Sequence, residues 1–136
     1  MTTTLWLRIS SVVSLLFSAG HIMGGFKSWS PAGENPVLQA MRTVRFDAMG
    51  ASRSYFDFYM GFGHTLSITL LLQTVLLWQL ATLARTDARR VRPLILVFAL
   101  ATAAGGVVAW CLLIPPPAVF SVVLLATLLV AWAVAR

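Results

Sequence analysis

Two histidines are the side chains of this 136-residue chain best suited to chemistry. His21 and His64 each lie near the end of an apolar stretch, and both ends are expected to face the same side of a membrane. Asp57 and Tyr59 shortly precede His64. Because an imidazole titrates near neutral pH, these groups could transfer a proton inside an apolar pocket. A shared site is therefore geometrically possible, and proton transfer is the simplest reaction that it would support.

Polar residues are costly inside a membrane and are functional candidates wherever they occur there. At about 100° per residue, the first and the second predicted spans each have a polar stripe along one face. The stripe of the first span consists of Ser11, Ser14, Ser18 and His21. That of the second span consists of Arg53, Asp57, Gly61 and His64. We predict a ligand pocket formed by His21, His64, Asp57, Tyr59, Ser18 and Arg53. Arg42 and Arg45 are predicted to contact an anionic head group.

Each of these residues also has a structural interpretation, which the sequence leaves open. Serines in spanning helices commonly return a hydrogen bond to the carbonyl four residues earlier, or allow close helix packing. Asp57 can close a capping box of the form S-x-x-D that begins at Ser54. Arg53 can pair with Asp57 four residues further on. Either histidine can be a hydrogen-bonded residue of a helix bundle.

The common catalytic signatures are missing from the sequence. It has no G-x-S-x-G, H-E-x-x-H or C-x-x-C motif and no phosphate-binding glycine loop. With four acidic residues, a carboxylate-rich metal site is not expected, and we predict no metal and no cofactor. Cys111 is the single cysteine, so an intrachain disulfide is impossible. Whether the protein is an enzyme stays open.

Hydropathy identifies the elements that hold these residues. Hydrophobic residues make up 59% of the chain and charged residues 10%, whereas a soluble domain has about 25% charged residues. A helix of about 20 apolar residues can cross a bilayer. Four stretches have roughly that length, at about 5–25, 55–84, 93–114 and 118–135. We predict an all-α fold, an integral membrane four-helix bundle that forms a single domain over residues 1–136.

The segment between the first two spans is expected to contain a helix of its own. Asn35 can cap it, Pro36 suits its first position, and Gly50 suits the position after its end. Apolar residues recur at helical spacing within it, at Val37, Met41, Val44 and Ala48. We therefore predict a short amphipathic helix in the outer loop between spans 1 and 2. The capping box would then start the second span near Tyr55.

Charge indicates the orientation of the chain. There are ten Lys or Arg residues against four Asp or Glu, which gives a net charge of +6. An excess of basic residues can indicate nucleic-acid binding. Here, however, Arg85, Arg89, Arg90 and Arg92 lie in one connection between spans, so the positive charge is better explained by membrane topology. The positive-inside rule places this connection in the cytoplasm, with both termini beside it. We predict a protein of the bacterial inner membrane that has no nucleic-acid partner. Trp29 is expected to belong to a belt of aromatic residues at the outer membrane surface.

The last two spans are predicted to form an antiparallel hairpin, because only Pro115-Pro116-Pro117 joins them. Small residues at packing spacing favour helix contacts in lipid. One such ridge consists of Ala101, Gly105 and Ala109. This ridge leads us to expect a homo-oligomer, either a dimer or a small ring.

Two motifs carry a family resemblance. They are Gly20-His21 and the run Ser52-Arg53-Ser54-Tyr55-Phe56-Asp57-Phe58-Tyr59-Met60-Gly61-Phe62-Gly63. At these motifs the chain resembles an uncharacterised family of small four-span bacterial inner-membrane proteins. The resemblance extends over nearly the whole chain and implies the four-span topology. In size and layout the chain is also similar to DoxX-like proteins and to the emopamil-binding sterol isomerase group, from which no residue role is carried over.

Three functional hypotheses are consistent with these residues. In the first, the outer half of the bundle binds a lipid, a quinone or a similar hydrophobic molecule. In the second, the protein is a non-catalytic interaction subunit whose small-residue faces bind other helices. In the third, it is a b-type haem protein ligated by His21 and His64. An apolar cavity beside His64 would favour the first hypothesis over the second.

Overall fold

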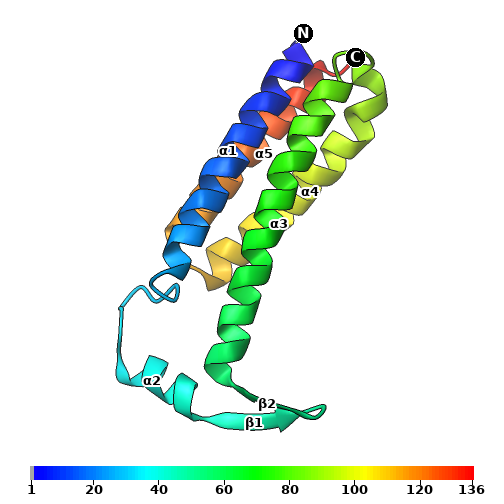
Figure 1. Ribbon diagram of the computed structural model, residues 1–136. Coiled ribbons are helices and arrows are strands. Elements are labelled where there is room, and N and C mark those ends of the chain that lie inside the picture. The colour runs from blue at the N-terminus through cyan, green and yellow to red at the C-terminus, as the bar shows by residue number, and fades with distance from the viewer. Residues whose placement is uncertain (1) are drawn as a thin grey trace. The chain divides into compact units, whose positions relative to one another are not determined.

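Four long apolar helices dominate the structure, a computed structural model that describes residues 2–136. In chain order they are α1 (Thr2–Gly25), α3 (Tyr55–Leu83), α4 (Ala88–Leu112) and α5 (Pro115–Val134) (Figure 1). Each is long and apolar enough to cross a membrane. The predicted apolar helices are confirmed, and they indicate a multi-pass membrane protein.

The described chain divides into two compact units. The first, called here the bundle unit, comprises the described part of Met1–Phe17 together with Leu70–Arg136. The second, the loop unit, comprises Ser18–Thr69. The bundle unit therefore holds parts of all four long helices. The loop unit holds the end of α1, the first part of α3 and the smaller elements between them.

Apolar side chains from all four long helices fill the core of the bundle unit. Leu7 of α1, Leu77 of α3, Ile95 of α4 and Leu128 of α5 are each 0% exposed. Small side chains lie among them, at Ala81, Ala99 and Ala131. Because lipid is as apolar as leucine, close packing of this kind stabilises helix contacts in a membrane more than burial does.

Hydrogen bonds between helices add to the packing of the bundle unit. The Ser11 hydroxyl on α1 donates to the backbone carbonyl of Thr74 on α3 at 2.8 Å. The Thr74 hydroxyl donates to the Ser14 hydroxyl oxygen at 3.0 Å. Ser10, which lies outside the predicted polar stripe of α1, donates to the Thr127 hydroxyl of α5 at 2.9 Å. Ser11 and Ser14 therefore join α1 to α3, which is a structural role.

Helices α4 and α5 pack along one another as the predicted antiparallel hairpin (Figure 1). The link between them differs from the prediction, because α4 ends at Leu112 and α5 already begins at Pro115. Residues Leu113 and Ile114 make the connection, and the three prolines form the first turn of α5. Proline is tolerated there because the first N–H groups of a helix have no partner within it.

The loop unit contains the predicted short helix, α2 (Pro36–Thr43). The Asn35 side chain caps it by accepting a hydrogen bond from the Leu38 N–H at 3.0 Å. The predicted continuation of this helix to Gly50 is wrong, because β1 (Arg45–Ala48) and β2 (Ala51–Ser54) form an antiparallel hairpin there. Met49 and Gly50 have φ angles of 51° and 80°, as a two-residue type I′ turn requires.

Helix α3 begins at Tyr55, where the capping box predicted it. The Asp57 carboxylate accepts from the Ser54 N–H at 2.8 Å, and the Ser54 hydroxyl oxygen accepts from the Asp57 N–H at 3.1 Å. Each side chain thus satisfies a backbone donor of the other residue. Asp57 therefore has the structural role that the sequence left open for it.

The ridge of small residues on α4 lies in two different environments. Ala109 is buried, whereas a Cβ added to Gly105 would meet nothing within 4 Å. A Cβ added to Gly106 would lie 3.1 Å from Ser121 of α5. The contact between α4 and α5 therefore uses Gly106, and Gly105 is open.

Candidate functional site

The site is centred on Trp29, in the loop that follows α1. Its ring centroid lies 5.1 Å from that of His21 and 5.2 Å from that of His64. The Tyr59 ring meets it edge-on, with 6.5 Å between centroids. The structure thus brings three of the predicted pocket residues to one indole.

Three glycines make room for this indole, and we call them the glycine cradle. They are Gly24, Gly25 and Gly63. A Cβ added to them would lie 2.9, 2.8 and 2.3 Å, respectively, from the nearest Trp29 ring atom. Close-packed interiors do not accommodate contacts that short. Glycine at these positions therefore permits the present place of Trp29.

Three hydrogen bonds fix Trp29 and its backbone. The indole Nε1–H donates to the His21 carbonyl at 2.7 Å. The Tyr59 hydroxyl donates to the Trp29 carbonyl at 2.9 Å, and the Trp29 N–H donates to the Gly24 carbonyl at 2.9 Å. The indole N–H is satisfied, as it usually is when tryptophan is partly buried.

His21 also bonds to α3 through its ring. Its Nδ1 lies 3.0 Å from the Ser67 hydroxyl oxygen, which lies 3.1 Å from the Gly63 carbonyl. When the hydroxyl donates to that carbonyl, its oxygen accepts the proton of Nδ1. In a neutral His21 this arrangement leaves Nε2 as a free acceptor. His21 is half-buried, whereas His64 is exposed.

The loop that carries Trp29 contains backbone strain. Ser28 and Trp29 have φ angles of 52° and 48°, in the left-handed region. This region costs a non-glycine residue roughly 1 to 2 kcal/mol. The glycine cradle, the ring contacts and the three hydrogen bonds offset that cost, and they hold the indole where it is.

The remaining predicted pocket residues do not contact the indole through any described hydrogen bond or ring pair. Asp57 caps α3, and Arg53 donates to the Ser52 carbonyl at 3.1 Å. In the described chain, no ion pair joins Arg53 to Asp57. Ser18 is 0% exposed, and its hydroxyl has no partner within residues 2–136.

The two arginines predicted to contact a head group have internal partners in the loop unit. Arg42 forms a bidentate salt bridge with Glu34, at 2.8 and 2.7 Å, and stacks 4.5 Å over the Phe56 ring. The hydrogen bond from Arg42 lowers the pKa of the exposed Glu34 carboxyl. Arg45 donates to the Ser52 carbonyl on the facing strand at 3.1 Å.

Sequence reasoning placed Trp29 at the membrane surface and missed its part in the site. A signal was available in the glycines. Gly24 and Gly25 follow His21 by about one helical turn, and Gly63 directly precedes His64. A glycine inside a helical pattern costs about 1 kcal/mol relative to alanine, so it usually has a packing reason.

The side chains do not form a recognisable metal site. Within residues 2–136, no three side chains of histidine, cysteine, aspartate or glutamate gather as a metal site requires.

Comparison of the chain with known protein families, characterised proteins and solved structures finds no match. The resemblance to small four-span inner-membrane proteins stays a prediction, and the geometry of the site is the basis for its interpretation.

Proposed function

We propose that the chain binds a hydrophobic molecule in the place where the Trp29 indole now lies. The molecule would have a flat polar ring, as a quinone has, or would be a lipid whose head group contains such a ring. One observation carries this proposal: a single indole contacts both imidazoles and fills the glycine cradle. The two fused rings of an indole resemble those of a naphthoquinone in size. We call the space bounded by His21, His64, Tyr59 and the glycine cradle the indole slot.

If a ligand displaced the indole, the groups that now contact Trp29 would contact the ligand instead. Tyr59 would offer its hydroxyl to a ligand oxygen in place of the Trp29 carbonyl. The imidazole Nε2 of His21 would accept a hydrogen bond from a hydroxyl of the reduced form, a quinol. A flat ring would then pack on the glycines in place of the indole. Binding sites of this kind combine an apolar wall with a few polar groups.

Backbone strain makes this exchange less costly. Ser28 and Trp29 occupy the left-handed region while the indole fills the slot. When the loop moves, both residues can return to an extended or helical conformation and recover roughly 1 to 2 kcal/mol each. The recovered free energy offsets part of the loss of the indole contacts.

We also propose that the protein lies in a bacterial inner membrane, with the site in the outer half of the bilayer and both termini in the cytoplasm. The arginines of the connection between α3 and α4 support this orientation, since such loops are usually cytoplasmic. A reporter fused after Arg136 is expected to be active only in the cytoplasm. Activity only in the periplasm would reverse the orientation.

The alternatives use the same residues differently. An interaction subunit would keep Trp29 in place as a structural side chain. A b-type haem protein would need the indole to leave both imidazoles before they could ligate iron. The interaction subunit therefore differs from the other two hypotheses in what happens to Trp29, and the haem protein differs from the proposed function in the molecule that takes its place.

Purification in mild detergent tests the proposal. The absorption spectrum would be recorded, and co-purified small molecules would be identified by mass spectrometry. The informative variant is Gly63→Leu, whose side chain would enter the indole slot, and the matched control is Gly61→Leu, which meets open space. We expect a quinone or lipid that is retained by the wild type and the control and depleted in Gly63→Leu.

Other outcomes oppose the proposal. Equal retention by both variants would show that any bound molecule lies elsewhere. No retained molecule in any form of the protein would favour the interaction subunit. A strong Soret band that is lost in His64→Ala would favour the haem protein.

A further inference from the structure

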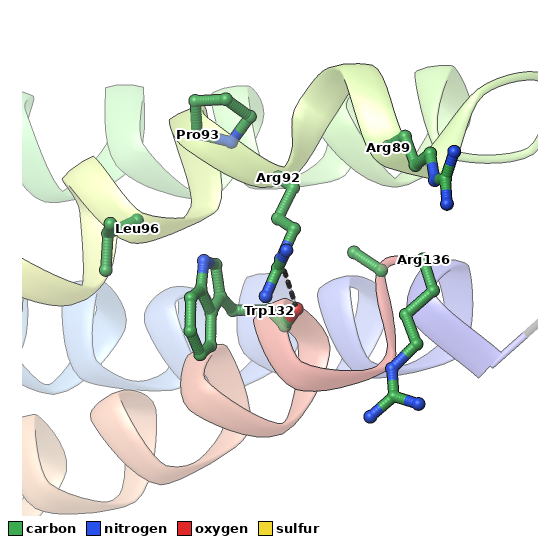
Figure 2. Close-up of a pocket in the computed structure, with 7 residues that line it drawn as sticks. Arg89, Arg92, Pro93, Leu96, Trp132 and Arg136 are labelled. Atoms are coloured by element: carbon green, nitrogen blue, oxygen red, sulfur yellow. Dashed lines mark hydrogen bonds between the residues drawn. The ribbon is translucent and has the colours of Figure 1, made fainter.

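An open pocket lies in the bundle unit, between the start of α4 and the end of α5. It has a volume of about 610 Å³, and its wall is formed by Arg89, Arg92, Pro93, Leu96, Trp132, Ala135 and Arg136. Figure 2 shows Arg92 extending from α4 toward Trp132, with Arg89 and Arg136 on one side of it and Leu96 on the other. One side of the pocket is thus cationic, and the other is apolar.

The residues that line the pocket include three arginines and no acidic side chain. Arg89, Arg92 and Arg136 form no salt bridge with any residue of the described chain. Asp87, the acidic residue of the adjacent connection, uses its carboxylate to accept from the Arg90 N–H at 3.1 Å. The field of three guanidinium groups in one pocket therefore attracts an anion.

Arg92 is held in place by Trp132. Its Nε donates to the Trp132 carbonyl at 3.3 Å, and its guanidinium carbon lies 4.4 Å from the centre of the indole ring. The terminal nitrogens of the guanidinium remain as donors. A guanidinium fixed in this way can bind phosphate with little loss of side-chain entropy.

Two further features match a phospholipid. Pro93 has no N–H, so the Arg89 carbonyl lacks its usual helical donor and can accept from a hydroxyl of a head group. On the other side, Leu96 leads along α4 to the exposed Leu100. An acyl chain can follow this apolar surface while the phosphate stays beside the arginines.

We infer that this pocket binds one anionic phospholipid, with the phosphate on Arg89 and Arg92 and an acyl chain along Leu96. Basic pockets between spanning helices bind anionic head groups in this way. The residues involved are separate from those of the indole slot. The inference therefore stands or falls independently of the proposed function.

The test counts lipids that remain bound to the purified chain in native mass spectrometry. The probes are dioleoylphosphatidylglycerol and dioleoylphosphatidylcholine, each added to delipidated protein in detergent. Arg89→Gln is the main variant, because Arg89 lines the pocket and forms no salt bridge within residues 2–136. Arg90→Gln is the matched control, since it removes an equal charge from the next residue, which does not line the pocket.

We expect one tightly bound phosphatidylglycerol per wild-type chain and about tenfold weaker binding in Arg89→Gln. Arg90→Gln should bind like the wild type, and Arg92→Lys should lose affinity because a lysine cannot keep the stacked, forked geometry. Equal weakening in Arg89→Gln and Arg90→Gln would overturn the inference, as would equal binding of phosphatidylcholine. Displacement of the lipid by millimolar glycerol phosphate would also overturn it, because the pocket would then take the phosphate alone.

Discussion

The indole N–H of Trp29 donates to the backbone carbonyl of His21 at 2.7 Å, eight residues back along the chain. This bond folds the loop after α1 back onto the helix. The ring that it orients then contacts the imidazoles of His21 and His64. A tryptophan from the loop therefore fills the space in which the sequence predicts a ligand.

Substitution of the glycine cradle should destabilise the protein. In Gly63→Ala the new Cβ would lie 2.3 Å from the indole, so the ring must move. Overpacking of this kind costs about 1 to 3 kcal/mol, which exceeds the gain in helix propensity of up to about 1 kcal/mol. The control Gly61→Ala meets nothing within 4 Å and should be neutral or stabilising. Reversible unfolding in detergent measures both, and equal stability of the two variants would mean that the cradle does not hold the indole.

The hydroxyl of Thr74 should matter for the packing of α1 on α3. In Thr74→Val the Ser14 hydroxyl, which is 0% exposed, loses the donor 3.0 Å away. The expected loss is about 0.5 to 1.5 kcal/mol in the free energy of unfolding. Thr69→Val is the control, because the Thr69 hydroxyl bonds only to the Thr65 carbonyl of its own helix on an exposed face. An equal loss of unfolding free energy in Thr69→Val would show that the effect comes from placing valine in the helix and not from losing the bond to Ser14.

The salt bridge between Glu34 and Arg42 should make the loop unit sensitive to acid. Because the pKa of Glu34 is lowered in the folded protein, the stabilisation is complete above its unfolded pKa. It is lost as the pH falls through the lowered folded value, that is, below about pH 4.3. Hydrogen exchange of the α2 amides should therefore accelerate in that range. Glu34→Gln should exchange faster already at neutral pH, and an unchanged acid response in this variant would show that another group is responsible.

Gly105, the open position of the ridge on α4, predicts contact with another copy of the chain. Gly105→Leu should leave the fold intact, since nothing lies within 4 Å of the position. It should lower the detergent-resolved mass if the ridge packs against a second chain. Light scattering with detergent correction measures that mass. If both the mass and the stability match those of the wild type, the ridge faces lipid.

Hydropathy and capping motifs were sufficient to predict much of the fold. Long apolar runs can satisfy their backbone in lipid only as helices, so the four long helices followed from the composition. Asn35 and the pair Ser54 and Asp57 fixed two helix starts, because their side chains bond to local backbone. The hairpin at Met49 and Gly50 was missed, since a methionine in the left-handed region has no sequence signature.

The site was harder to predict because its main contacts are not local. The places of His21 and His64 near the ends of two apolar stretches led to the prediction of a shared site, and in the structure both imidazoles contact Trp29. It could not show that a loop tryptophan would return to them, because that contact depends on the turn at Ser28 and Trp29. The Asp57 carboxylate was predicted to line the pocket, whereas in the structure it accepts a hydrogen bond from the Ser54 N–H at the start of α3.

Quenching of Trp29 fluorescence tests whether a quinone displaces the indole from the indole slot. In a variant that keeps Trp29 and has phenylalanine at the other four tryptophans, 2-methyl-1,4-naphthoquinone would be titrated while emission and iodide accessibility are recorded. We expect saturable quenching together with a rise in iodide access, because the quinone displaces the indole from its slot. A matched variant that keeps only the exposed Trp110 should show neither saturation nor a change in access. Linear quenching that is equal in the two variants, with Trp29 still shielded from iodide, would show that the quinone does not enter the indole slot.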